Sequence, residues 1–499
     1  MNQNNISAAE LFQRVRELLT LPDLEPKTRN KMMHDTLILC CHEGVKDTKQ
    51  AFGNLFSQVD YLCKARGIKV ADKIAIQTMR RHSNSQEPLS GEDLKYDARA
   101  LTLFISAVFE ERIPHEVNVL IPHINRPFQK GLEINNRRIR CIVKNWDSDF
   151  IRVDIDQDAD EEEYLVRLKD EENHIDHTYL WDLLKEGMQL NLLDCQVKQP
   201  IITPRLIVVE PDYLVDISSI ATCFTAFGHH PLLYLLNLMK PRANTQATLL
   251  GNFAGAALDD IINSHGKYQV NETVKSNFRE KALEFCTCPW FDAKKFYTDA
   301  SLQAFNLQQV VDILFPRTAS QAKMSAFRGE SLYDRKKAIL EPSFVCEALG
   351  IQGRVDLMTT DCKLLVEQKS GRNMNIETHQ VDPGYHSYQL EPHYVQLLLY
   401  YGVLQHNFKL SNDRVNIRLL YSKYQPQDGL MVVAYYQKLF KEAIEYRNQL
   451  VAASFEIAKE GFEHALNEFT PEVLNVAGTQ DFFYNKYLKP QIEAITKPL

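Results

Sequence analysis

Apolar residues recur at helical spacing in the first part of the chain, residues 1–127. Ser7–Glu10 (SAAE) has the pattern of a capping box in front of the run LFQRVRELL. A longer apolar stripe lies in SGEDLKYDARALTLFISAVFEE, and the polar, proline-containing stretch SNSQEPLSGED separates the two halves. The pattern predicts a helical N-terminal domain over residues 1–127, and we find no chemistry-bearing motif in it.

The pattern changes between residues 128 and 212 to short runs rich in β-branched residues: RRIRCIVKNW, FIRVDID, EYLVRLKD and PRLIVVEPDYLVD. Several short strands in such a short segment favour a small β-barrel-like domain or a sandwich. The segment includes the acidic stretch Asp154–Glu163, DIDQDADEEE, whose alternating acids resemble a calcium loop. Ala159 and Leu165 stand where such a loop needs glycine and glutamate, so a solvated acidic loop is predicted.

Helical and strand-like patterns alternate from residue 213 to about 465, which predicts an α/β core. The expected helices cover 218–240, 248–266, 392–405 and 437–466. The expected strands cover 353–358, 363–369, 416–423 and 429–436. The remaining residues, 466–499, are predicted to form a C-terminal helical or linker segment.

Three charged residues interrupt two of these strand-like runs: Asp356 in GRVDLM, and Glu367 and Lys369 in KLLVEQK. Side chains two positions apart on a strand share a face, so Glu367 and Lys369 project together, away from Val366 and Gln368. The intervening TTDC is turn-like, and a hairpin of the two runs would bring Asp356 beside Glu367. Two converging carboxylates repel each other unless a cation lies between them. A surface hairpin with a Glu–Lys pair is the alternative.

A metal site at these residues has a definite chemistry. The oxygen ligands of Asp356 and Glu367 favour Mg²⁺ or Mn²⁺ over Zn²⁺. An ammonium such as that of Lys369 can orient or help deprotonate a metal-bound water, and it offsets charge in the transition state. The apolar triplet Leu364, Leu365 and Val366 predicts a buried strand, where unpaired charge is costly, and this favours a functional site over a surface hairpin.

The composition narrows the classes of function. The chain has 499 residues, 44% of them hydrophobic and 24% charged, which is ordinary for globular domains. Its net charge of −8 excludes a polycation that coats nucleic acid, although a local basic channel stays open. With no secretory signal, no apolar run of membrane length and ten scattered cysteines, we expect a cytoplasmic protein without a membrane partner. No G-x-x-x-x-G-K-[ST] motif occurs, so no ATP site is expected.

Two motifs around the charged residues resemble a known superfamily. Gly353–Asp356 (GRVD) and Leu365–Gly371 (LVEQKSG) resemble the metal-binding core of the PD-(D/E)xK nucleases, specifically the RecB-like branch. Gln396 and Tyr400 match the Q-x-x-x-Y motif of that branch, and their four-residue spacing places them on one helical face. The segments LEPS and LGIQG upstream are similar to the nuclease domain of flap-processing replication nuclease–helicases and their bacterial relatives.

The resemblance covers residues 213 to about 466, and the β-rich segment fits the small barrel that precedes the nuclease domain in such proteins. It implies a restriction-endonuclease-like core, a mixed sheet flanked by helices, that hydrolyses DNA phosphodiester bonds with Mg²⁺ or Mn²⁺. Asp356 and Glu367 would bind the metal, Lys369 would position the attacking water, and Gln396 and Tyr400 would hold the site or the phosphate backbone.

The implied substrate is single-stranded DNA or flaps in replication, recombination or repair, with a helicase as partner, either fused or separate. Two alternatives stay open. The chain could be a DNA-binding or scaffold module with a weakened nuclease fold, or a sequence-specific endonuclease of a defence system.

The sequence departs from the family pattern at two places. Many RecB-like nucleases have a metal-ligating histidine four residues after a helix glycine, and Gly255 stands there; Asp259, one turn on, could partly replace it or be a solvated or capping residue. Some relatives hold an iron–sulfur cluster, and Cys223 lies near its first ligand. No cysteine follows Cys362, so no cluster is expected. Cys286-Thr-Cys288 is a weak zinc pattern.

Basic residues near the motifs are candidates for contact with a DNA strand, because phosphate contacts give affinity without sequence preference. The candidates are Arg354, Arg335, Lys336, Lys337 and Arg372, together with the loop Arg372–Gln389. For Arg354 a structural pair with a local carboxylate is an equal alternative, and for the others an ordinary solvated surface.

Overall fold

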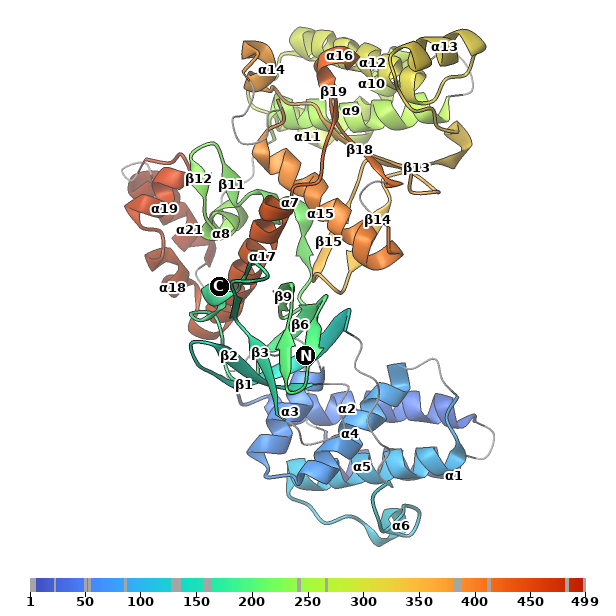
Figure 1. Cartoon of the computed structure of the whole chain (residues 1–499), viewed down its shortest axis with the longest axis vertical. Coiled ribbons are helices and arrows are strands. Elements are labelled where there is room, and N and C mark those ends of the chain that lie inside the picture. Colours follow the sequence, from blue (N-terminus) through green and yellow to red (C-terminus); the bar gives the residue numbers. More distant parts are fainter. Residues whose placement is uncertain are drawn as a thin grey trace. The chain divides into compact units, whose positions relative to one another are not determined.

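The computed structural model describes residues 6–21, 24–48, 52, 55–84, 88–126, 136–155, 163–239, 244–264, 268–380, 388–410, 414–480 and 484–496. The chain divides into two compact units: residues 1–213 with 454–460, and residues 214–453 with 461–499. A helical N-terminal region is followed by several mixed sheets with helices (Figure 1). The predicted α/β class is therefore confirmed at this level. The predicted boundary between residues 127 and 128 lies outside the described residues.

The N-terminal region of the first unit is helical, as predicted. Its described helices are α1 Ala8–Thr20, α2 Pro26–Val45, α3 Leu55–Ala65, α4 Val70–Asn84, α5 Gly91–Phe109 and α6 His115–Asn118. The capping box of α1 is present, because Glu10 N–H donates to Ser7 Oγ and Ser7 N–H donates to the Glu10 carboxylate. Apolar side chains from all six helices form one buried core.

The β-rich segment of the first unit forms a mixed sheet whose described strands follow the order β7-β8-β3-β2-β1-β6-β9. The strands are β1 Arg138–Trp146, β2 Phe150–Ile155, β3 Tyr164–Arg167, β6 Gln189–Leu193, β7 Gln196–Lys198, β8 Ile201–Thr203 and β9 Leu206–Val209. A separate short pair joins β4 Lys169–Asp170 and β5 Ile175–Asp176. Within the described segment no pairing joins β7 to β9, so no closed barrel is seen.

The predicted acidic loop can be followed only in part. Asp154 lies at the end of β2, and its carboxylate pairs with Lys144 at 2.5 Å and Lys73 at 3.2 Å. Residues 156–162 lie outside the described part of the chain. Asp154 is thus held by two ammonium groups, and Glu163 at the other end of the stretch is exposed.

The second unit contains a five-stranded sheet, counted over its described residues, in the order β13-β16-β17-β18-β19. These strands are β13 Ala338–Leu340, β16 Leu357–Thr359, β17 Leu364–Lys369, β18 Asn416–Tyr421 and β19 Leu430–Val432. The β17–β18 pairing is parallel and the other three pairings are antiparallel. A smaller sheet joins β10 Val215–Asp216, β15 Ile351–Arg354 and β14 Ser343–Cys346.

Helices cover the two faces of the five-stranded sheet. On one face lie α9 Gln246–Asn263 and α12 Ala293–Leu314 (Figure 1). Their apolar side chains are buried in one core with Leu364, Val366 and Leu420. α10 Val270–Glu280, α11 Ala282–Cys286 and α13 Ala319–Phe327 surround these two helices. On the other face, α15 Glu391–Phe408 lies against β18 and β14. Short elements complete this part: η2 Arg335–Lys337, α14 Met374–Thr378 and α16 Pro426–Gly429.

The predicted continuous helix over 218–240 is wrong. The chain forms α7 Ile217–Ala221, a hairpin of β11 Phe224–Thr225 and β12 Gly228–His229, and α8 Leu232–Met239. Gly228 has a φ of 138°, which is strained for residues with a side chain, and the Thr225 hydroxyl donates to the Gly228 carbonyl. The local turn therefore overrides the helical apolar spacing.

The helix predicted over 437–466 is two helices. α17 Gln437–Glu460 ends before Gly461, whose φ of 92° stops the helix, and α18 Phe462–Asn467 follows. The chain then forms α19 Pro471–Val476, a π-helical turn Tyr484–Leu488 and α21 Lys489–Thr496. Among the described helices, none is both long and apolar enough to cross a membrane.

Candidate active site

The two charged runs form the predicted hairpin, because β16 and β17 pair antiparallel with Leu357 opposite Val366. The first run is not one strand, however. β15 ends at Arg354 in the smaller sheet, and β16 begins at Leu357 in the larger one. Tyr400 Oη donates to the Arg354 carbonyl at 2.7 Å and occupies the last acceptor of β15. Asp356 therefore lies at the crossing between two sheets.

The three predicted charges come together at one end of this hairpin. Asp356 Oδ2 accepts the Gln368 N–H at 2.6 Å, so it is tied to the backbone of β17 beside Glu367. Lys369 Nζ donates to Glu367 Oε1 at 2.7 Å. Glu367 is only 6% exposed, and its buried Oε2 has no hydrogen-bond partner among the residues that the structure describes. The site thus holds a buried carboxylate with one unused oxygen.

The alternation of β17 agrees with the sequence interpretation. Gln368, which was expected to point away from Glu367, donates to Ser422 Oγ at 2.7 Å. Ser422 in turn donates to the Gln303 side chain of α12, on the opposite face of the sheet. This buried network fixes the strand that carries Glu367 and Lys369.

Burial raises the pKa of both carboxyl groups, Asp356 and Glu367. Asp356 keeps some exposed surface, yet burial raises the pKa of its carboxyl group, against the lowering effects of the Gln368 N–H and Lys369. Burial also raises the pKa of Glu367, to about 7; Lys369 lowers this pKa and the nearby Asp356 raises it. Two such groups gain from a cation, because it favours their charged forms.

The residues present fit a magnesium-type ion. Mg²⁺ is commonly held by one or two carboxylates with water completing its shell. Asp356 and Glu367 supply two, including the unpartnered Glu367 Oε2. Across the described residues there is no group of three or more His, Cys, Asp and Glu side chains that could hold a metal. That finding also leaves Cys286 and Cys288 without further described ligands for zinc.

One face of α9 runs along this site. A Cβ atom on Gly251 would lie 3.2 Å from Ser370 Oγ, at the end of the Lys369-Ser370-Gly371 run. One turn on, a Cβ atom on Gly255 would meet no atom within 4 Å. Burial, together with the charges of Glu341 and Asp356, raises the pKa of Asp259 to about 6. There is therefore open space at Gly255 on α9. One turn further on, the pKa of Asp259 responds to the charge of Asp356.

Gln396 and Tyr400 lie on α15, over the same site. Gln396 is 9% exposed, and within the described segments its buried Oε1 has no hydrogen-bond partner. Burial raises the pKa of Tyr400, as do the charges of Glu367 and Asp356, so its hydroxyl stays protonated. Gly353 fits beneath it, because an added Cβ would come within 3.2 Å of Tyr400 Oη. Tyr400 thus fixes the backbone before Asp356.

The predicted DNA-contact residues are dispersed. Arg354 pairs with Glu341 at 3.0 Å and Arg372 pairs with Glu377, and both arginines are exposed. Arg335 donates to the carbonyls of Ile261 and Ile262 and so caps the C-terminal end of α9. Lys337 pairs with Asp361, in the turn at the other end of the hairpin, and Lys336 is exposed. Of the loop 372–389, residues 381–387 lie outside the described residues.

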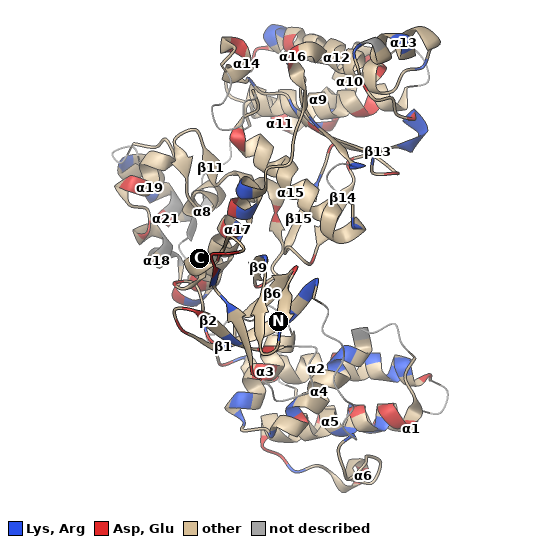
Figure 2. Cartoon of the chain, in the orientation of Figure 1, with Lys and Arg blue, Asp and Glu red and all other residues tan. Residues whose placement is uncertain are grey.

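Two residues that the sequence interpretation did not include lie beside Arg372. Lys423 Nζ pairs with Glu377 at 3.2 Å, and Tyr424 Oη donates to Glu377 at 2.8 Å. They follow β18 directly, and Ser422 N–H donates to the Lys369 carbonyl. A signal was present, because charged and aromatic residues follow a strand that a parallel sheet could place next to the KSG run. Figure 2 shows that acidic and basic residues are otherwise interspersed along the chain.

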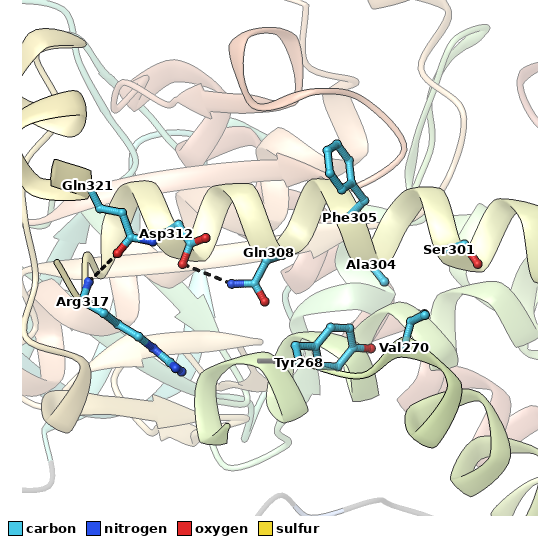
Figure 3. Close-up of a pocket in the computed structure, with 9 residues that line it drawn as sticks. All are labelled: Tyr268, Val270, Ser301, Ala304, Phe305, Gln308, Asp312, Arg317 and Gln321. Carbon is cyan, nitrogen blue, oxygen red and sulfur yellow. Dashed lines mark hydrogen bonds between the residues drawn. The ribbon is translucent and has the colours of Figure 1, made fainter. Parts of the chain in front are cut away.

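A cavity of about 530 Å³ lies elsewhere in the second unit. Its described lining is Tyr268, Val270, Ser301, Ala304, Phe305, Gln308, Asp312, Arg317 and Gln321 (Figure 3). On α12, Ser301, Gln308 and Asp312 lie about 100° to 180° around the helix from Gln303 and Leu307, which face the sheet. The cavity is therefore on the side of α12 away from the carboxylates.

Comparison of the sequence with models of known protein families and with curated proteins gave no match. Similarity therefore does not assign a family to the chain. The functional argument depends on the residues of the site and their geometry.

Proposed function

We propose that the chain is a metal-dependent DNA nuclease of the PD-(D/E)xK superfamily, RecB-like branch. The observation that carries the proposal is the convergence of Asp356, Glu367 and Lys369 at one hairpin end, where the buried Glu367 Oε2 has no partner in the described part of the chain. A structural ion pair would use both carboxylate oxygens, since an unsatisfied buried oxygen costs free energy. A carboxylate oxygen without a partner is therefore more consistent with a cation-binding site than with a structural ion pair.

In this mechanism Asp356 and Glu367 hold Mg²⁺ or Mn²⁺, which supplies an activated water and charge stabilisation when bound. Lys369, held at 2.7 Å by Glu367, orients the attacking water and offsets negative charge on the phosphate. Tyr400 keeps Asp356 in place through the Arg354 carbonyl. The Gln396 amide, whose carbonyl oxygen has no partner among the described residues, is placed to hold a water or the DNA backbone.

The finer fold assignment is part of the same proposal. The mixed sheet with a central β16–β17 hairpin, the parallel strand β18 and flanking helices α9 and α15 has the element order expected of a restriction-endonuclease-like core. The seven-stranded sheet of the first unit, counted over its described strands, lies where such proteins have a small β-rich domain ahead of the core, although the described strands do not close into a barrel. Single-stranded DNA or flaps are the proposed substrate, and a helicase the proposed partner.

The basic residues at the rim support a DNA backbone as ligand. Arg372 and Lys423 share Glu377, and the pKa of this acid falls to about 2 because Arg372, Tyr424 and Lys423 bond to it. Both cations lie within a few residues of the strand ends that carry Lys369 and Tyr421. A DNA phosphate could replace Glu377 as the partner of Arg372 and Lys423. The free-energy cost would be small, because exposed ion pairs are weak.

The test is cleavage of end-labelled single- and double-stranded DNA with Mg²⁺ or Mn²⁺. Wild type is compared with Lys369→Ala and with Lys363→Ala, a matched control at the exposed turn of the same hairpin. We expect cleavage by wild type and Lys363→Ala and loss in Lys369→Ala. Equal rates in wild type and Lys369→Ala would contradict the proposal. Comparison of 5′ and 3′ labels gives the polarity.

A second candidate is a DNA-binding or scaffold module with a weakened nuclease fold. The open space at Gly255 favours it, because the usual histidine ligand is missing there and no third ligand is in place in the described residues. DNA binding in wild type and Lys369→Ala, without cleavage by either, would support this candidate.

A further inference from the structure

A histidine lies beside Lys369 and takes no part in the motifs above. Lys369 and Tyr421 are register partners on the parallel strands β17 and β18, so their side chains leave the same face of the sheet. Tyr421 Oη lies 2.9 Å from His393 Nδ1. On α15, His393, Gln396 and Tyr400 are spaced three and seven residues apart and share a helical face. His393 therefore belongs to the row of side chains that covers the site.

The hydrogen bonds around Tyr421 determine which nitrogen of His393 carries the proton. Tyr421 is fully buried, and its hydroxyl oxygen accepts the Leu390 N–H at 3.1 Å. Burial raises the pKa of Tyr421, so the phenol keeps its proton and must donate it. His393 Nδ1 lies at hydrogen-bond distance from this hydroxyl and can accept its proton. When Nδ1 accepts this bond, the ring proton of His393 is on Nε2.

The imidazole of His393 is neutral. Burial lowers its pKa to about 3, and the charge of Lys369 contributes to the lowering. Nε2–H makes no hydrogen bond within the described residues. The ring thus presents one unused donor beside the Lys369 ammonium without adding a second positive charge.

We propose that His393 Nε2–H donates a hydrogen bond to a non-bridging phosphate oxygen of the bound DNA strand, with Tyr421 as the residue that positions the ring. The proposal rests on the nuclease function proposed above. A phosphate that approaches Asp356 and Glu367 is repelled by their charge and needs donors on its other side. Lys369 supplies one, and the neutral imidazole of His393 supplies another.

Two near-isosteric replacements separate this role from a structural one. His393→Gln places an amide nitrogen near the position of Nε2 and gives up the bond to Tyr421. His393→Asn keeps an acceptor for Tyr421 near the position of Nδ1 and offers no donor at Nε2. A structural role of the His393–Tyr421 bond predicts that Asn is tolerated better than Gln, whereas a donor role predicts the reverse.

The experiment measures single-turnover cleavage of a labelled oligonucleotide with Mg²⁺, and thermal unfolding of each variant. We expect His393→Asn to lose about 10- to 100-fold in rate, as for a lost hydrogen bond to a charged group, and His393→Gln to stay within a few-fold of wild type. Tyr421→Phe should cause a smaller loss than His393→Asn, because the ring can then place its proton on either nitrogen.

The outcomes distinguish this inference from the function on which it rests. If wild type cleaves no faster than Lys369→Ala, the nuclease function and the role of His393 both fail. If wild type cleaves and Lys369→Ala does not, but His393→Asn cleaves like wild type or better than His393→Gln, the role of His393 alone is overturned. Unfolding temperatures identify any variant whose cleavage rate falls because the protein is less stable. In that case the rate of His393→Gln relative to wild type tests the donor role of His393.

Discussion

Both ends of the β16–β17 hairpin carry acidic residues, but the pKa of the acid is lowered at one end and raised at the other. At the turn, Asp361 accepts from Thr359 Oγ1 at 2.8 Å and from Lys337 Nζ at 3.0 Å. Slight burial raises the pKa of Asp361, but these bonds outweigh it and lower the pKa to about 2. At the other end, burial raises the pKa of Asp356 and of Glu367.

The difference teaches how to recognise a functional carboxylate in this fold. A structural acid is provided with all its partners by its own chain, as Asp361 is. Glu367 keeps an oxygen without a partner in a place where that omission is costly. A buried carboxylate oxygen without a partner among the described residues distinguishes the end of the hairpin at which we propose that a ligand binds.

The largest expected effect separates the two ends by activity. Glu367→Gln should lower cleavage on the order of 10³-fold, because it removes one of two metal-holding carboxylates and several kcal/mol of charge stabilisation. Asp361→Asn should leave the rate within a few-fold of wild type. Steady-state cleavage of labelled DNA at saturating Mg²⁺ measures both, and comparable losses in the two variants would contradict the assignment.

A gain-of-ligand variant sharpens the comparison. Gly255→His places an imidazole in the open space on α9, and we expect Mn²⁺ to bind about 10-fold more tightly, the lower end of what supporting metal-site residues contribute. Gly255→Ala is the control, because it removes the helix glycine without adding a ligand. Isothermal titration with Mn²⁺ measures the affinity. Equal affinities in both variants would show that Gly255 does not face the metal.

The two ends should also differ in the sign of their effect on stability. Without metal, Asp356→Asn should raise the free energy of unfolding at pH 8 by about 1 kcal/mol, because it removes a buried charge next to Glu367. Asp361→Asn should lower it by about 1 kcal/mol through lost hydrogen bonds. Urea unfolding in EDTA measures both. A decrease in both variants would mean that the Asp356 carboxylate is fully compensated.

The smallest effect concerns a paired group elsewhere in the second unit. His229 lies 2.7 Å from both Glu391 and Glu442, and its bonds to Glu391 and then Glu442 raise its pKa to about 9. A raised pKa stabilises the fold fully below the unfolded value of about 6.5, and this stabilisation is lost as the pH rises through about 9.

His229→Gln should therefore reduce the decline of the unfolding temperature between pH 7 and pH 10. The effect should be small, because the three side chains are partly exposed to solvent. Thermal unfolding across this pH range measures it. An unchanged slope in His229→Gln would mean that His229 is not charged in the folded protein.

Much of the fold follows from the pattern of the sequence. The helices of the N-terminal region, the capping box at Ser7 and the hairpin of the two charged runs were predicted correctly. These features depend on contacts close in sequence or on strong periodicity, so local physics decides them. The three charges of the site were also located, because charge in an apolar strand is visible without a structure.

The features that the sequence did not reveal depend on contacts distant along the chain. The crossing of the chain at Asp356 depends on Tyr400, 44 positions later, which holds the Arg354 carbonyl. The neighbourhood of His393 depends on the parallel pairing of β17 with β18. The hairpin at Gly228 depends on a backbone conformation that apolar spacing does not report.

The crossing of the chain at Asp356 connects the candidate active site to both the larger and the smaller sheet of the second unit. Glu367 and Lys369 belong to the larger sheet, whereas the backbone just before Asp356 belongs to β15 of the smaller sheet. The Asp356 carboxylate is nevertheless tied to the larger sheet, because its Oδ2 accepts the Gln368 N–H of β17 at 2.6 Å. An ion bound by Asp356 and Glu367 would therefore add a second link between β17 and the segment that joins the two sheets.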